Sequence, residues 1–164
     1  MMKFAAKPFQ GVSVEGGGKT ARIVFSKQCK PCTVMPLDPV APGSHAYEVV
    51  MPVKQGRTSL GWQPTRDNTV YMMSDYREPD KKYVSYGGMG FMYPMKKVGS
   101  QKYAVGDRVR VELDLSPDGT GTARYSVNGK FSGEHPWTLG PQAYPAFSCE
   151  SGETVMDVTW VSDC

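Results

Sequence analysis

Residues 106–115, GDRVRVELDL, decide the fold because charged and apolar side chains alternate without a break from Arg108 to Leu115. The apolar positions are Val109, Val111, Leu113 and Leu115, and a charged residue stands before each of them. Successive side chains of a β-strand point to opposite faces, so this period of two predicts a strand over residues 108–115 with one buried face and one solvated face.

The segment that follows continues the pattern through two turns. Asp118-Gly119 predicts a turn, after which apolar residues again alternate over residues 122–127. Asn128-Gly129 comes next, and this pair most readily supplies the positive φ angles of a two-residue hairpin turn. Residues 143–149, AYPAFSC, then predict a further apolar strand.

The rest of the chain also predicts β-structure. Glycine and proline recur so often that no window of helical length shows a period of 3.6 residues. We expect strands at residues 12–15, 20–25, 46–53, 58–62, 69–73, 82–86, 108–115, 122–127, 143–149 and 154–161. Short strands at this spacing predict an all-β fold, an antiparallel two-sheet β-sandwich, and the 164 residues predict a single domain over 1–164.

The order of these motifs resembles the SPRY domain family. Gly-Asp and an apolar strand ending in Leu-Asp are followed by a strand, Asn-Gly and finally Tyr-Pro-Ala at residues 144–146. Upstream, residues 43–49 (GSHAYEV) and 59–62 (SLGW) are similar to the family's two earlier strands. The resemblance covers roughly residues 12–160 and implies a concanavalin A-like jelly-roll sandwich that binds proteins through loops at one edge.

The resemblance also implies where a partner would bind. Carried over by position, the surface comprises the loop around Asp38, the loop with Tyr76 and Arg77, and the turn Glu150-Ser151. Several peptide-binding members have Trp-Gly in that turn, where this chain has Ser151-Gly152, so their peptide specificity does not transfer. Trp137 is a further candidate binding residue, because we expect it in a loop and tryptophan is enriched at binding hot spots.

Composition and charge limit the classes of partner that we expect. The net charge of +3 is small and the basic residues are interspersed with acids, so we expect no nucleic-acid partner. No apolar run is long enough to insert into a membrane, and the N-terminal apolar stretch is too short for a secretory signal. Four cysteines are too few for a disulfide scaffold, which predicts free thiols and a cytoplasmic location.

Three local patterns suggest chemistry that we weigh and set aside. Cys29-Lys30-Pro31-Cys32 lacks a second matched pair for zinc and a following helix for redox catalysis, so we expect two thiols in a turn. Residues 16–20 (GGGKT) lack the first glycine of a phosphate-binding loop, and a strand is expected after them. Glu112 and Asp114 share a strand face, as in some glycosidases, but arginines flank them and Pro117 replaces the third acid.

These patterns predict a non-catalytic protein–protein interaction module without cofactor or metal, acting as an adaptor or structural subunit of a larger eukaryotic assembly. A glycan-binding, lectin-like protein is the alternative, since galectins and legume lectins share this sandwich architecture. The sequence shows neither a galectin-type His-x-Asn-x-Arg strand nor the clustered acids of a calcium-dependent lectin.

Overall fold

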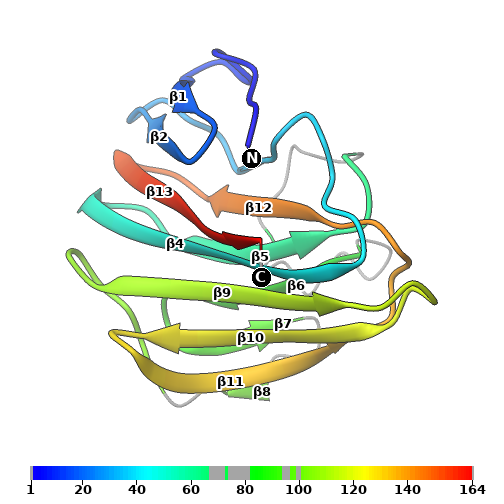
Figure 1. Cartoon of the computed structure of the whole chain (residues 1–164). Helices are drawn as coiled ribbons and strands as arrows, with labels where there is room; N and C mark the ends of the chain where they lie inside the picture. Colours follow the sequence, from blue (N-terminus) through cyan, green and yellow to red (C-terminus); the bar gives the residue numbers. More distant parts are fainter. Residues whose placement is uncertain (1, 67–72, 74–81, 94–96, 99–100, 164) are drawn as a thin grey trace.

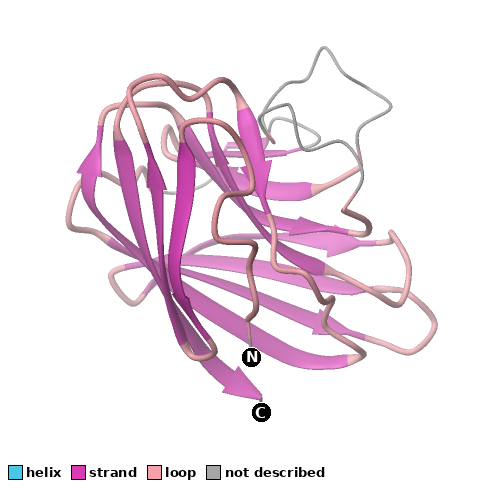
Figure 2. Ribbon diagram, turned by 90° about the horizontal axis from the view of Figure 1, so that it is seen from above, coloured by secondary structure: helices cyan, strands magenta, loops and turns pink. Residues whose placement is uncertain are grey.

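The computed structural model describes residues 2–66, 73, 82–93, 97–98 and 101–163. These residues form thirteen strands in two sheets, and no helix occurs among them (Figures 1 and 2). The strands are β1 Val12–Gly17, β2 Thr20–Phe25, β3 Cys32–Val34, β4 Gly43–Lys54, β5 Thr58–Gln63, β6 Val84–Gly87, β7 Phe91–Tyr93, β8 Lys97–Val98, β9 Arg108–Leu115, β10 Gly121–Val127, β11 Lys130–Trp137, β12 Tyr144–Cys149 and β13 Thr154–Asp163.

The larger sheet has seven strands in the order β1-β2-β13-β4-β9-β10-β11, and the smaller has six in the order β3-β12-β5-β6-β7-β8. All their pairings are antiparallel. The predicted all-β, two-sheet antiparallel sandwich is therefore confirmed. In Figure 1, β9, β10 and β11 of the larger sheet lie in front of β6, β7 and β8 of the smaller one.

The alternating segments pair as their sequence indicates. β9 presents its valines and leucines to the core and its charged residues to solvent, and it lies between β4 and β10. The β10–β11 hairpin turns at Asn128 (φ 52°) and Gly129 (φ 80°), so the predicted two-residue turn is confirmed. β11 is one of the two edge strands of the larger sheet, and it contains Pro136 with an exposed side chain.

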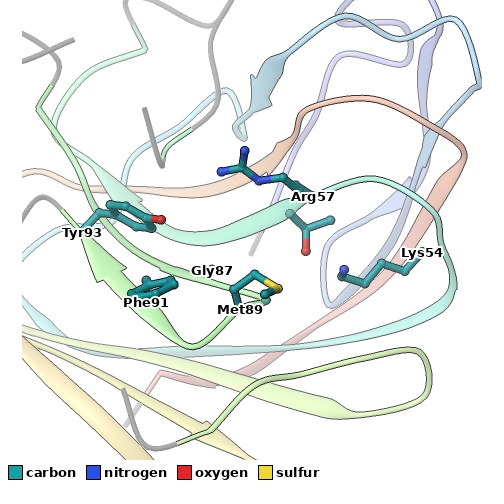
Figure 3. A pocket seen from close by; sticks show the side chains of 8 residues that line it. Lys54, Arg57, Gly87, Met89, Phe91 and Tyr93 are labelled. Carbon is teal, nitrogen blue, oxygen red and sulfur yellow. The ribbon is translucent and has the colours of Figure 1, made fainter. Parts of the chain in front are cut away.

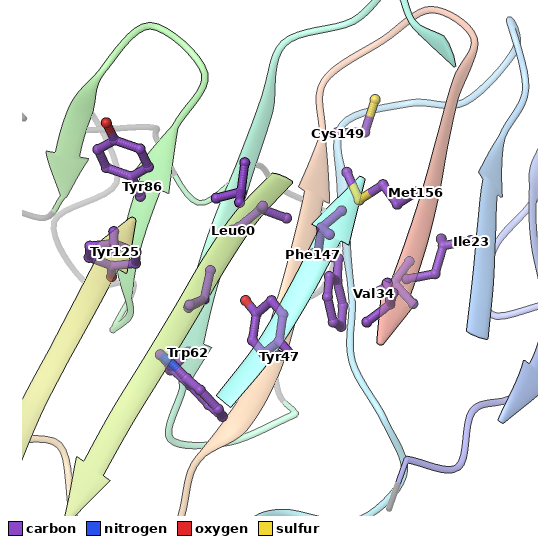
Figure 4. Packing of buried hydrophobic residues seen from close by; sticks show 14 of the residues in the cluster. Ile23, Val34, Tyr47, Leu60, Trp62, Tyr86, Tyr125, Phe147, Cys149 and Met156 are labelled. Carbon is purple, nitrogen blue, oxygen red and sulfur yellow. The ribbon is translucent and has the colours of Figure 1, made fainter. Parts of the chain in front are cut away.

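Aromatic side chains join the two sheets in the core (Figure 4). Tyr47 on β4 packs against Trp62 on β5 and Phe147 on β12, with ring centroids 5.3 and 4.9 Å apart. Tyr86 on β6 stacks on Tyr125 of β10 at 5.2 Å. Because these rings come from opposite layers and are almost fully buried, they fix how the sheets pack.

A second, smaller apolar cluster lies apart from this core. Its buried members are Met35, Met73, Tyr83, Tyr93 and Ala146. Side chains alternate along β6 and β7, so Tyr86 and Met92 enter the main core whereas Tyr93 joins the second cluster. The smaller sheet is therefore buried on both faces along β5, all six of whose residues are buried.

Four strands were not expected from the sequence. β3, β7 and β8 have only two or three residues, which is too few to show a period. The fourth, β11, contains Gly133 and Pro136 and was therefore interpreted as a loop. The strand expected at residues 69–73 lies outside the described residues except for Met73, which is in a turn. The other nine predicted strands are present with shifted ends in most cases.

The strand directions define two ends of the sandwich. We call one the Arg57 end; there β4, β10 and β12 finish, and it carries residues 55–57, 88–90, 101–107, 128–129 and 150–153. We call the other the Asp38 end; it carries residues 35–42, 116–120 and 138–143. In Figure 1 the Arg57 end is on the left, where the arrowheads of β4, β10 and β12 point.

Candidate binding surface

The predicted surface residues do not gather at one place. Asp38 lies close to Val40, which pairs with Ala143 just before β12 begins, whereas Glu150 follows the last residue of β12. Six strand residues separate the two positions, a distance of about 20 Å at 3.3 Å per residue. Asp38 and the Glu150-Ser151 turn therefore belong to opposite ends of the sandwich, and the expectation of one shared surface was wrong for this pair.

Trp137 is also placed differently from the expectation. It is the last residue of β11, not part of a loop, and its side chain is fully buried. The indole Nε1 donates a hydrogen bond to the carbonyl of Gly140 at 2.8 Å. Trp137 is thus a core residue in this structure and is not available for contact. Tyr76 and Arg77 lie outside the described residues, so the loop that holds them stays a prediction.

The Arg57 end carries most of the strongly exposed apolar side chains. Met89 is 60% exposed, Val105 56% and Phe131 61%, and all three lie at this end. Leu37, 44% exposed, is the other large apolar residue exposed among the described residues, and it lies at the Asp38 end. Single exposed apolar residues are ordinary, but several at one end of a domain make that end a candidate interaction site.

Hydrogen bonds join the three segments that carry Met89, Val105 and Phe131. The amide of Tyr103 donates to the carbonyl of Gly88 at 3.2 Å, which joins the Met89 turn to the Val105 loop. Gln101 bridges to β11, because its amide donates to Ser132 Oγ at 3.1 Å and its Nε2 donates to the carbonyl of Lys130 at 3.2 Å. Residues far apart in sequence are therefore fixed beside one another at this end.

A small pocket of about 50 Å³ opens next to Met89. Its walls are formed by Lys54, Arg57, Thr58, Gly87, Gly88, Met89, Phe91 and Tyr93. Figure 3 shows the rings of Phe91 and Tyr93 on one side, Lys54 on the other, and Met89 and Arg57 between them. We call it the Gly87 pocket.

Glycine keeps this pocket open. A Cβ atom on Gly87 would lie 3.6 Å from the Tyr93 ring, and one on Gly88 would lie 3.4 Å from both Lys54 Nζ and the Tyr103 ring. Neither glycine has a positive φ, so the conformation of the backbone does not demand glycine at either position. The missing side chains therefore leave space between the aromatic rings and the lysine.

The rim of the pocket is charged. Arg57 Nη1 lies 3.2 Å from Glu150 Oε2; the Arg57 side chain is largely solvated and that of Glu150 is partly solvated. The amide of Glu150 also donates to the carbonyl of Arg57 at 2.9 Å, which brings the predicted Glu150-Ser151 turn beside the pocket. Lys54 makes no ion pair with any residue that the structure describes.

Glu112 and Asp114 are held in a ladder of ion pairs on the solvated face of the larger sheet. Arg110 Nε lies 3.1 Å from Glu112, and Arg124 pairs with Asp114. A hydrogen bond from Ser44 at 2.6 Å, followed by the Arg124 contact, lowers the pKa of Asp114 below its ordinary value. Asp114 is thereby kept ionised, which is the opposite of what a general acid requires.

The two cysteines of the C-x-x-C sequence lie near a third. Cys32 is the Cα partner of Cys149 across the β3–β12 pair, and Cys29 precedes β3 in a turn. All three are free thiols and are buried. Burial raises the pKa of Cys32 and of Cys149 to about 12, so both are protonated and poor nucleophiles at neutral pH. No metal-holding group of three or more His, Cys, Asp or Glu occurs in the described part of the chain.

The similarity of this chain to known proteins lies in its fold. No family model matches the sequence, and neither does any curated protein. A crystal structure of a human SPRY domain matches with a TM-score of 0.66 at 19% identity, over 88% of this chain and 93% of that one. The SPRY domain of human HERC1 matches with 0.52 at 15%, over 98% and 92%, and the TRIM65 PSpry domain with 0.63 at 12%, over 99% and 90%.

The chain therefore has the SPRY fold, as its motifs predicted. Across the described residues there is also no helix of the length and apolarity needed to cross a membrane.

Sequence reasoning missed most of the Arg57 end. It identified Glu150 and Ser151 but not Arg57, Met89 or Val105. One local signal was present. Residues 87–92 read GGMGFM, and the glycines on either side of Met89 have no polar side chains that could shield it from solvent. Because glycine-rich turns are usually plain connections, this signal alone does not predict a binding site.

Proposed function

We propose that this protein is a protein-binding module whose partner contacts the Arg57 end. The observation that carries the proposal is that Met89, Val105 and Phe131, each more than half exposed, all lie at one end of the sandwich. The aromatic bridge between the sheets makes the scaffold stiff, which supports recognition by the segments that it holds in place.

The proposal extends to a non-catalytic role as an adaptor or structural subunit of a larger assembly in the eukaryotic cytoplasm. Ion-paired carboxylates and protonated, buried thiols favour binding over catalysis. Two of the solved structures with this fold are human domains, which supports a eukaryotic setting.

The test is quantitative affinity purification of the full chain from cells that naturally express it. Variants Met89→Asp and Val105→Asp each replace an exposed apolar residue of the Arg57 end by a charge, and Leu37→Asp makes the same change at the Asp38 end. We expect a stoichiometric partner to be retained by the wild type and Leu37→Asp, and lost by the other two. Circular dichroism and thermal melts establish that all three variants fold.

Two results would contradict the proposal. One is recovery of the chain without any stoichiometric partner, and the other is equal recovery of the partner by all variants. A glycan array provides an independent check, because reproducible sugar binding by the purified chain would favour the lectin alternative instead.

A further inference from the structure

We infer that the Gly87 pocket binds an acidic peptide segment of a partner protein and receives one apolar side chain from it. The inference rests on the proposed function, because it names the chemistry of the partner at the Arg57 end. It draws on the shape of the pocket and on the charges around it.

The apolar half of the pocket suits a single side chain. Phe91 and Tyr93 form one wall, and the exposed Met89 side chain lies beside them (Figure 3). A volume of about 50 Å³ holds one aliphatic group and not a folded element. Methionine adapts its shape to an inserted group, so Met89 can close over the side chain that enters.

The charged residues that line that apolar space are both cations. Lys54 and Arg57 line the pocket. The Lys102 side chain lies nearby, because its Cγ is 3.6 Å from the position that a Cβ on Gly90 would occupy. Among the described residues that line the pocket none is acidic, and the carboxylate paired with one of its cations is that of Glu150, which binds Arg57 at the rim. A segment with acids on either side of an apolar residue would complement this arrangement.

The binding test uses a fluorescein-labelled nonapeptide with a central leucine flanked by two glutamates on each side. Its matched controls replace the leucine by serine, or all four glutamates by lysine. Fluorescence anisotropy should show binding of the acidic leucine peptide, weakened by salt because the pairs are exposed. We expect each control peptide to bind at least about tenfold more weakly. Amide shifts of Gly87, Gly88 and Met89 locate the peptide in an NMR spectrum.

Four variants test the individual contacts. Gly87→Ala adds one methyl group at ordinary contact distance from Tyr93 and should weaken the acidic peptide about tenfold, since a misplaced methylene in an apolar pocket has that effect. Lys54→Glu should weaken it about fivefold or more, and Glu150→Gln should tighten it about twofold by releasing Arg57. Lys19→Glu, an equal charge reversal at the β1–β2 turn, should change nothing.

The outcomes separate this inference from the proposed function. Equal binding of the acidic and basic peptides, or shifts that avoid Gly87, Gly88 and Met89, would overturn the inference. So would sedimentation of the protein with phosphatidylserine vesicles when the acidic peptide does not bind. If the peptide fails while Met89→Asp still abolishes partner capture, the protein-binding function stands and only the Gly87 pocket assignment falls.

Discussion

Gly61 and Gly87 should respond in opposite ways to the same substitution by alanine. Both glycines lie in the smaller sheet, on the adjacent strands β5 and β6. A Cβ on Gly61 would lie 1.9 Å from the carbonyl oxygen of Val84 and 2.7 Å from Cα of Ser85, both in the backbone of β6. A Cβ on Gly87 would meet no atom nearer than 3.6 Å.

The size of each effect follows from these contacts. Relieving a 1.9 Å contact requires β6 to move more than about 1 Å from β5, which breaks buried hydrogen bonds between them. Overpacking and the lost bonds together should cost about 4 kcal/mol or more. Gly87→Ala should instead stabilise the fold by about 0.4–1 kcal/mol, because alanine restricts the unfolded chain at a position that it can occupy without strain.

Urea denaturation followed by tryptophan fluorescence measures both changes, since Trp62 is buried beside Gly61. At about 2–4 °C per kcal/mol, Gly61→Ala should lower the melting temperature by at least roughly 8 °C. Gly87→Ala should leave it equal or slightly higher. The reasoning would be refuted by a Gly61→Ala protein within about 1 kcal/mol of the wild type, or by equal losses in the two variants.

Three further predictions concern single groups. Because the folded pKa of Asp114 is lowered, its stabilisation is present above about pH 4 and is lost on acidification, so the stability gap between wild type and Asp114→Asn should close towards about pH 2 in urea titrations. Cys32 and Cys149 should resist Ellman's reagent at pH 8 in the native protein and react in urea, with peptide mapping as the readout; native labelling of either would contradict their burial. Tyr47→Phe should cost about 1–2 kcal/mol in denaturation experiments, since it removes the 2.9 Å hydrogen bond to the carbonyl of Gly61; no measurable loss would show that the bond contributes nothing.

The sequence predicted most of the fold because its signals are local. The alternation at residues 108–115 and the Asn128-Gly129 turn depend on neighbouring residues alone, and both are present. β11 could not be recognised in this way, because Gly133 and Pro136 usually end strands. Pro136 is tolerated there since an edge strand has one side without a neighbour, so a missing amide donor costs little.

The candidate surface was less predictable because it depends on which loops share an end. Asp38 and Glu150 could be separated only once the direction of β12 was known. Arg57 and Glu150 meet because β12 pairs with β5, and no local sequence pattern predicts that pairing. Trp137 shows the same limit, since its burial follows from a strand that was not expected.

The edge strand β11 has a consequence for how this sheet can associate. Pro136 removes an amide donor, Lys130 and Glu134 place charges along the strand, and the ladder to β10 is irregular between Tyr125 and Ser126. These features discourage an incoming chain from extending the sheet by backbone pairing, which is a common route to aggregation. Contacts along this border should accordingly depend on side chains and not on added backbone pairing.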